Sequence, residues 1–245
     1  MNRAAARGLF GAVLILALWE GCARGFQLPA YTLPAVSDIL GGAWAHRRAL
    51  WPAALLTGSE ALLGYALGAA LGTGLAVLLV LLPPIRRGVL PLVLAVNSVP
   101  VVAWSPLILL WFGMGIASKV AAVTLAVGFT VFLSALSGLD RVDRRSVDLL
   151  RSFGAGPLRI LWRLRLPAAL PLVAAGLRVS TVRAVIVAIV TEMLGAYGGL
   201  GWIIYQAVTT IDFVQVWSAI LVASALSLGF FGLVSALERR FIFWR

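Results

Sequence analysis

The chain has 245 residues, of which 62% are hydrophobic and only 12% are charged. Soluble domains average roughly 45–50% apolar and about 25% charged residues, so this composition excludes a water-soluble globular protein. The net charge of +11 comes mainly from arginines spread between apolar blocks. That spread argues against a nucleic-acid-binding domain and is typical of loops beside membrane spans.

The chain contains few of the residues that commonly act in catalysis or bind metals. His46 is the only histidine and Cys22 the only cysteine, so a disulfide within the chain and a thiolate metal cluster are excluded. The usual histidine-based catalytic groups are also absent. We therefore predict no catalytic residue, no metal site and no enzymatic activity.

The first apolar run follows two basic residues, Arg3 and Arg7, as in a signal peptide. Trp19 and Glu20 stand where small residues should mark a cleavage site. This favours a retained first span over a cleaved signal.

A membrane-spanning helix needs about 20 mostly apolar residues. Six candidate runs are present, at 6–22, 61–82, 89–111, 119–136, 168–194 and 214–237. Pro83-Pro84 is expected to end the second run. The sequence therefore predicts an all-α polytopic membrane protein with six transmembrane helices in a single domain, 1–245.

The second run carries Gly64, Gly68 and Gly72 at four-residue spacing along one face. Such spacing lets two helix backbones approach closely in lipid. We interpret it as tight packing within the chain, with a subunit interface as the alternative.

The third run, 89–111, contains Pro91, Pro100 and Pro106, with Asn97 between the first two. Proline removes a backbone donor and kinks a helix. Backbone carbonyls freed at membrane depth must be buried in protein or line a wet cavity. This run is therefore the best candidate to line a pathway.

The basic residues indicate an orientation. With the N-terminus in the cytoplasm, six spans leave most arginines inside, and both termini are inside as well. The basic residues then left outside are Arg24, Arg47, Arg48 and Lys119.

Charged residues inside a membrane are costly and are candidates for function. In a structural interpretation, Arg178 reaches the inner headgroups, while Arg183 and Glu192 pair with polar groups on neighbouring spans. In a functional one, a translocation pathway is lined by Asn97, Trp104, Arg183 and Glu192. An anionic substrate would suit Arg183, and a neutral heterocycle would suit the other three.

One inside loop, 138–166, is long and patterned. Val147, Leu150 and Phe153 recur at three-residue spacing, which predicts a short amphipathic helix. Gly154 is expected to end that helix, as a glycine past a helix terminus often does.

A second helical stretch, 158–166, alternates apolar residues with arginines. Two interpretations of the loop stay open at this point. It is either an interfacial helix held on anionic lipid or a docking surface for a cytoplasmic partner.

The loop resembles the signature of permease subunits of binding-protein-dependent ABC importers. That pattern is Glu-Ala-Ala, three residues, Gly, nine residues, Ile, one residue, Leu-Pro. The corresponding residues here are Asp148, Leu149, Leu150, Gly154, Leu164, Leu166 and Pro167. Every spacing is met, while Asp-Leu-Leu replaces Glu-Ala-Ala.

The resemblance extends over 51–244, the expected core of the permease domain. Four stretches resemble the nitrate, sulfonate and taurine permease group, which also includes transporters of pyrimidine precursors of thiamine: 63–72, 106–115, 166–178 and 192–203. The resemblance implies the type I ABC importer permease fold and a small solute as substrate, taken across the inner membrane by alternating access.

The resemblance also implies partners. Two permease copies would form the pathway, ATPase subunits would bind inside and a solute-binding protein would act outside. A homodimer is expected, with a pair of different permeases as the alternative. The coupling loop, 138–167, would contact the ATPase through Val147, Asp148, Leu149, Leu150, Arg151, Phe153, Gly154, Leu164, Leu166 and Pro167.

This chain lacks a glycine-rich phosphate loop ending in Gly-Lys-Ser/Thr. We therefore expect it to bind no cofactor, with ATP and Mg carried by the partner ATPase. A secondary transporter that works without ATP is the rival hypothesis, but the inverted repeats typical of such proteins are not evident in the sequence.

Overall fold

The computed structural model describes residues 3–241 and is helical throughout, with no β-strand in that range. The elements are α1 (Arg3–Gly25), α2 (Val36–Ala45), α3 (Arg47–Leu81), α4 (Pro83–Asn97), α5 (Val101–Phe112), α6 (Ile116–Asp140), α7 (Arg144–Ser152), α8 (Pro157–Ile160), a π-helical turn η1 (Leu161–Arg165), α9 (Leu166–Leu194), α10 (Leu200–Thr209) and α11 (Phe213–Phe241). The last residues of the expected core, 242–244, lie outside the described range.

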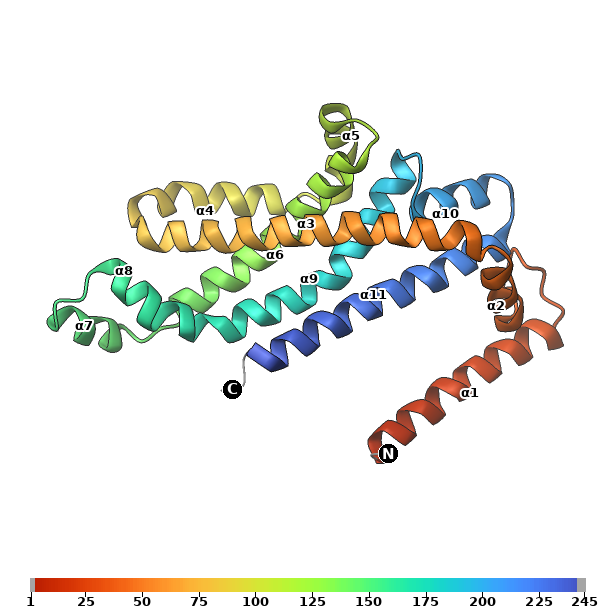
Figure 1. Cartoon of the computed structure of the whole chain (residues 1–245), viewed down its shortest axis with the longest axis horizontal. Coiled ribbons are helices and arrows are strands. Elements are labelled where there is room, and N and C mark those ends of the chain that lie inside the picture. The colour runs from red at the N-terminus through yellow and green to blue at the C-terminus, as the bar shows by residue number, and fades with distance from the viewer. Residues whose placement is uncertain (1–2, 242–245) are drawn as a thin grey trace.

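Four long helices, α3, α6, α9 and α11, form the body of the molecule, and α3 and α9 each pack against the other three (Figure 1). The loop helices α7 and α8 lie at one end, beside the turn between α3 and α4, and we call this the α7 end. The opposite end, with α2 and α10, is called the α10 end. Helix α1 diverges from the body and contacts chiefly α2.

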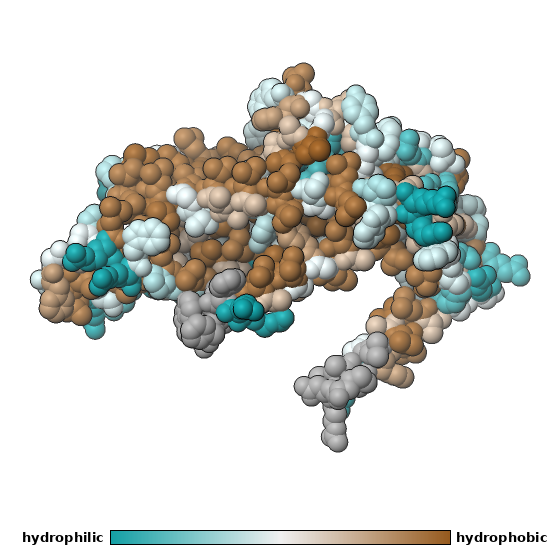
Figure 2. Space-filling view, in the orientation of Figure 1, coloured by the Kyte–Doolittle hydropathy of each residue, from teal (hydrophilic) through white to brown (hydrophobic). Residues whose placement is uncertain are grey.

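A broad apolar surface separates hydrophilic residues at the two ends of the molecule (Figure 2). In the described part of the chain, four helices are long and apolar enough to cross a membrane: Arg47–Leu81, Ile116–Asp140, Pro157–Leu194 and Phe213–Arg240. A bent pair, α4 with α5, would make a fifth. Helix α1, which holds the first expected span, is not among them, so the six-span count stays a prediction.

The third expected span does not form one continuous helix. Helices α4 and α5 are bent by 96° relative to each other across the break that precedes Val101. Pro100 cannot donate a backbone hydrogen bond, and it disfavours the helical conformation of the residue before it. Pro91 and Pro106, in contrast, lie inside helices.

Helices α3 and α6 pack closely through the glycine stripe. A Cβ atom added at Gly64 would lie 2.5 Å from the Cβ of Val123, and one at Gly68 would lie 2.8 Å from the carbonyl oxygen of Thr124. A Cβ atom added at Gly72 would likewise clash with the α6 backbone, at the carbonyl oxygen of Gly128. The interpretation of the stripe as packing within the chain is confirmed.

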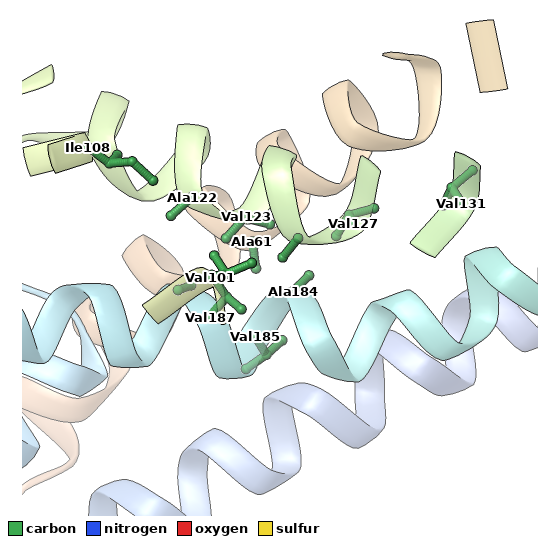
Figure 3. Close-up of a cluster of buried hydrophobic side chains, with 12 residues drawn as sticks. Ala61, Val101, Ile108, Ala122, Val123, Val127, Val131, Ala184, Val185 and Val187 are labelled. Carbon is green, nitrogen blue, oxygen red and sulfur yellow. The ribbon is translucent and has the colours of Figure 1, made fainter. Parts of the chain in front are cut away.

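The main buried cluster joins α3, α5, α6 and α9 (Figure 3). Its members are mostly alanine and valine, including Ala61, Val123, Ala184 and Val185. Small side chains let the helix axes lie close together, which is how helices associate where no hydrophobic effect drives them. This packing holds the polar positions of α9 in a defined place relative to α3 and α6.

Candidate coupling loop and translocation pathway

Helix α7 has well-defined ends. Its N-cap residue, Asp143, accepts a 3.2 Å hydrogen bond from the backbone N–H of Arg145. At the other end Gly154 has φ of +77° and donates to the carbonyl of Arg151 at 2.8 Å, and Ala155 donates to that of Leu150 at 3.0 Å. This is the left-handed glycine cap of a helix C-terminus, and the prediction that Gly154 ends the helix is confirmed.

The apolar residues of the loop point in two directions. Val147 is 5% exposed and packs toward the bundle, while Leu149 is 58% exposed and Phe153 is 77% exposed. The expected single stripe of Val147, Leu150 and Phe153 is therefore divided. The exposed pair, Leu149 and Phe153, forms an apolar surface that faces away from the bundle.

The second half of the loop continues directly into α9. Ile160 and Leu161 are buried and anchor it against the bundle. The π-helical turn η1 ends at Arg165, just before Pro167 in the first turn of α9. A proline lacks the N–H that a regular helix would use here, and π-helical turns accommodate such interruptions. Leu164 and Leu166 are half-buried, and Pro167 is exposed.

The candidate pathway residues do not all lie together. Arg183 is exposed along α9 and donates a 3.2 Å hydrogen bond to the hydroxyl of Thr130. Asn97 is half-buried at the end of α4, beside the break. Trp104 is half-buried against the main cluster, and its indole N–H has no hydrogen-bond partner within residues 3–241.

Glu192 is fully buried at the α10 end. Its Oε1 accepts from the hydroxyl of Thr57 at 2.7 Å, and its Oε2 accepts from the backbone N–H of Gly201 at 2.7 Å. The hydroxyl of Thr57 in turn accepts from the N–H of Leu200 at 2.9 Å. The carboxylate thus lies at the N-terminus of α10, where the helix dipole favours a negative charge.

Lys119 was counted in the sequence only as an outside charge, yet it is fully buried. Its ammonium donates to the carbonyls of Met114 and Gly195, each at 2.5 Å, and lies close enough to Glu60 and Glu192 to interact with both. We call Glu60, Lys119 and Glu192 the buried charge cluster. One signal could have revealed it: Lys119 is the only lysine in a chain whose other basic residues are arginines.

Two further ion pairs join helices nearer the α7 end. Arg86 of α4 makes a bidentate contact with Asp140 of α6, at 2.8 and 2.5 Å. Arg178 of α9 lies 3.5 Å from Glu238 of α11, whereas the sequence suggested that it reaches the headgroups. Within residues 3–241 no group of three or more His, Cys, Asp or Glu side chains is arranged to hold a metal ion.

This arrangement of helices matches solved structures of importers. One, titled "Inward facing conformations of the MetNI methionine ABC transporter", superposes with a TM-score of 0.62 at 21% identity, covering 80% of this chain and 96% of that chain. Another, an amino acid ABC transporter with histidines, gives a TM-score of 0.61 at 20% identity and covers 78% and 93%. The fold is that of a type I ABC importer permease.

The chain belongs to the family described as the binding-protein-dependent transport system inner membrane component, which it matches over residues 59–243. It is 33% identical to a probable ABC transporter permease protein of Haemophilus influenzae, over 94% of each chain. It is also 33% identical to the formylaminopyrimidine transport permease ThiX of Halalkalibacterium halodurans, over 95% of this chain and 93% of that protein. The taurine permease TauC of Escherichia coli is 32% identical over 66% of this chain and 60% of its own length.

The protein is therefore the multi-pass transmembrane subunit of a binding-protein-dependent ABC importer in the inner membrane. ATP hydrolysis takes place on a separate subunit, and a solute-binding protein completes the system.

Proposed function

We propose that two copies of this chain enclose a pathway for a small organic solute, and that Arg183 lines it. The observation that carries the proposal is the exposure of Arg183 within a long apolar helix. A guanidinium facing lipid at that depth would be costly, whereas one facing a water-filled passage between two subunits would be hydrated. The same reasoning places the exposed side of α9 toward the second copy.

The proposed pathway has a positively charged wall and one half-buried amide. Arg183 supplies the charge, and Asn97 lies at the break between α4 and α5. Glu192 accepts hydrogen bonds from Thr57 and Gly201, so both of its carboxylate oxygens have partners in this conformation. The positive wall favours a small organic anion, such as a sulfonate, as the substrate.

A pyrimidine precursor of a vitamin is the second candidate substrate. It is favoured by the similarity to the formylaminopyrimidine permease, which extends over nearly the whole chain. In that case Asn97 and Trp104 would supply the polar contacts of a neutral ring.

We also propose that the ATPase docks on α7, and the exposed apolar surface of Leu149 and Phe153 supports this. In the predicted orientation this surface faces the cytoplasm, where exposed apolar patches mark interaction sites. We place the groove of the ATPase there. Closure of the ATPase dimer on ATP would move α7 and, through α8 and η1, which continue directly into α9, the pathway helices. ATP and Mg would be bound by the partner alone.

The test uses the complete importer, with its ATPase and solute-binding protein, in proteoliposomes. Uptake of taurine and of formylaminopyrimidine is measured for the parent, Arg183→Ala and Arg183→Lys. We expect uptake of the anion to fall at least about tenfold in the alanine variant, and to recover in part with lysine. A parent that takes up only formylaminopyrimidine selects the second candidate. Normal uptake by Arg183→Ala would show that Arg183 does not line the pathway.

Two differently tagged copies of the chain, expressed together, test the dimer. Recovery of both tags in one purified importer supports the homodimer. Recovery of one tag alone, with a different permease polypeptide, would overturn it.

A further inference from the structure

A cavity of about 680 Å³ lies behind α7, on the side of the helix that faces the bundle. It is lined by residues of α7, the ends of α3 and α6, the start of α4 and the turn η1, and it is open on one side. Its charged lining residues are Arg86, Asp140, Arg144, Asp148, Arg151 and Arg165. Figure 2 shows hydrophilic residues gathered at this end of the molecule.

The charges around the cavity do not cancel. Arg86 is neutralised by its bidentate contact with Asp140, and Arg151 lies 3.3 Å from Asp148. Arg144 and Arg165 line the same cavity, and neither forms an ion pair with another described residue. Two positive charges, from the first turn of α7 and the last residue of η1, are thus left to attract an anion.

The lining of the cavity also includes apolar side chains. Val80 of α3 and Val142, just before α7, are half-buried, and Pro83 is exposed. A ligand that fills the space therefore meets guanidinium groups and hydrocarbon together. Such a mixed lining fits an amphipathic anion better than a small hydrated one.

The position in the fold suggests where such an anion comes from. The cavity lies where the apolar helix α3 ends, at the end of the molecule that carries most of the arginines. The positive-inside rule places that end at the cytoplasmic leaflet, whose anionic lipids bind basic pockets between helices. A guanidinium matches a phosphate through two parallel hydrogen bonds.

We propose that this cavity binds the phosphate group of an anionic phospholipid from the inner leaflet, held by Arg144 and Arg165. The glycerol end of the lipid lies against Val80 and Val142. The bound lipid fills the space between α7 and the bundle and so supports the loop from behind. This inference does not depend on which solute is transported.

Arg144 and Arg165 could instead bind an acidic side chain of the ATPase. The geometry disfavours this alternative. The exposed residues Leu149 and Phe153 do not line the cavity. A partner seated on them approaches α7 from the side opposite the bundle. Val147, Asp148 and Arg151, which the family resemblance also assigns to ATPase contact, line the cavity. The exposed apolar part of the docking surface, Leu149 and Phe153, therefore lies outside the lipid site.

The test uses the purified full chain, exchanged into an equimolar mixture of phosphatidylglycerol and phosphatidylcholine, with bound lipids counted by native mass spectrometry. The double variant Arg144→Ala/Arg165→Ala should lose selectivity for phosphatidylglycerol by about fivefold for each arginine removed. The matched control is Arg159→Ala/Arg163→Ala. It removes the same charge from exposed positions outside the cavity and should keep the parent's selectivity.

Folding is checked separately, by monodispersity in phosphatidylcholine alone. If the alanine pair does not fold, Arg144→Lys/Arg165→Lys takes its place, since it keeps the charge and loses the bidentate geometry. It should show weaker selectivity than the parent. Unchanged selectivity in the folded cavity variant, or an equal loss in the control, overturns the proposal.

Two further measurements distinguish the sources of the anion. Equilibrium dialysis with radiolabelled inorganic phosphate should show no binding to the parent. Binding that disappears in the cavity variant, without any lipid selectivity in the parent, would assign the site to a soluble phosphate and overturn the lipid. Loss of the ATPase from the cavity variant in pull-down, with lipid selectivity unchanged, would assign the arginines to the partner.

Discussion

Glu192 accepts a 2.7 Å hydrogen bond from the hydroxyl of Thr57, across 135 residues of sequence. Both side chains are fully buried. Because Thr57 also accepts from the N–H of Leu200, this one contact joins α3, α9 and the start of α10. The α10 end is therefore held together by polar contacts, whereas the middle of the bundle is held by alanine and valine.

Thr57→Val should destabilise the protein, because it keeps the shape of the side chain and removes both hydrogen bonds. Glu192 would lose the hydrogen bond to Oε1 and keep the one from Gly201 to Oε2. The N–H of Leu200 would lose its acceptor. We expect a loss of about 1–3 kcal/mol, measured as a lower thermal unfolding midpoint in detergent. Thr209→Val, at an exposed position, is the control and should unfold like the parent. Equal midpoints for both variants would mean that water replaces the contact.

Lys119→Met should destabilise the protein more than Thr57→Val does. The ammonium of Lys119 satisfies two backbone carbonyls and lies beside two carboxyl groups. Removing one partner of a buried charged group costs about 3–5 kcal/mol, so little folded protein should be recovered after detergent extraction. Arg48→Met removes a basic residue from an exposed position at the same end of the molecule and should leave the yield unchanged. A normal yield of Lys119→Met would show that the buried charge cluster is dispensable for folding.

Gly154→Asp should leave insertion of the chain into the membrane intact and impair its coupling to the ATPase. A Cβ at Gly154 meets no atom within 4 Å, but φ is +77°, so a side chain there costs about 1 kcal/mol or more through the backbone alone. The variant should reach the membrane in normal amounts, lose the ATPase in pull-down and abolish uptake.

The control for that prediction is Gly156→Asp. Gly156 is equally open but has φ of −72°, so the same charge is added without backbone strain. Leu150→Arg should behave like Gly154→Asp. If Gly154→Asp and Leu150→Arg both retain the ATPase, the loop is a lipid-surface helix and coupling occurs elsewhere.

The orientation is tested by reporter fusions. Fusions after Arg87 and Arg145 should report the cytoplasm, because the arginines concentrate at the α7 end. Fusions near Asp38 and Tyr197, at the α10 end, should report the outside. An external signal at Arg145 would place the proposed docking loop in the wrong compartment.

Several features of the protein follow from its sequence alone, because they depend on local chemistry. Apolar composition requires lipid as the surroundings, and Pro83-Pro84 does end α3. The αL glycine cap at Gly154 and the short helix before it were predictable from residue type and spacing. The resemblance of the loop and of four other stretches to importer permeases agreed with the family match.

Tertiary structure decided what depends on contacts between distant segments. The sequence could not show that 89–111 breaks into two helices, because tertiary packing decides whether a proline is tolerated inside a helix, as Pro91 is, or ends it, as Pro100 does. The sequence marks Lys119 only as the single lysine of the chain. It could not show that Lys119 turns inward, since the carbonyls that accept its hydrogen bonds come from two separate turns. The division of the loop into a buried Val147 and an exposed Phe153 depends likewise on where the bundle lies. Periodicity assigns residues to faces of a helix, and only packing determines which face meets protein, lipid or water.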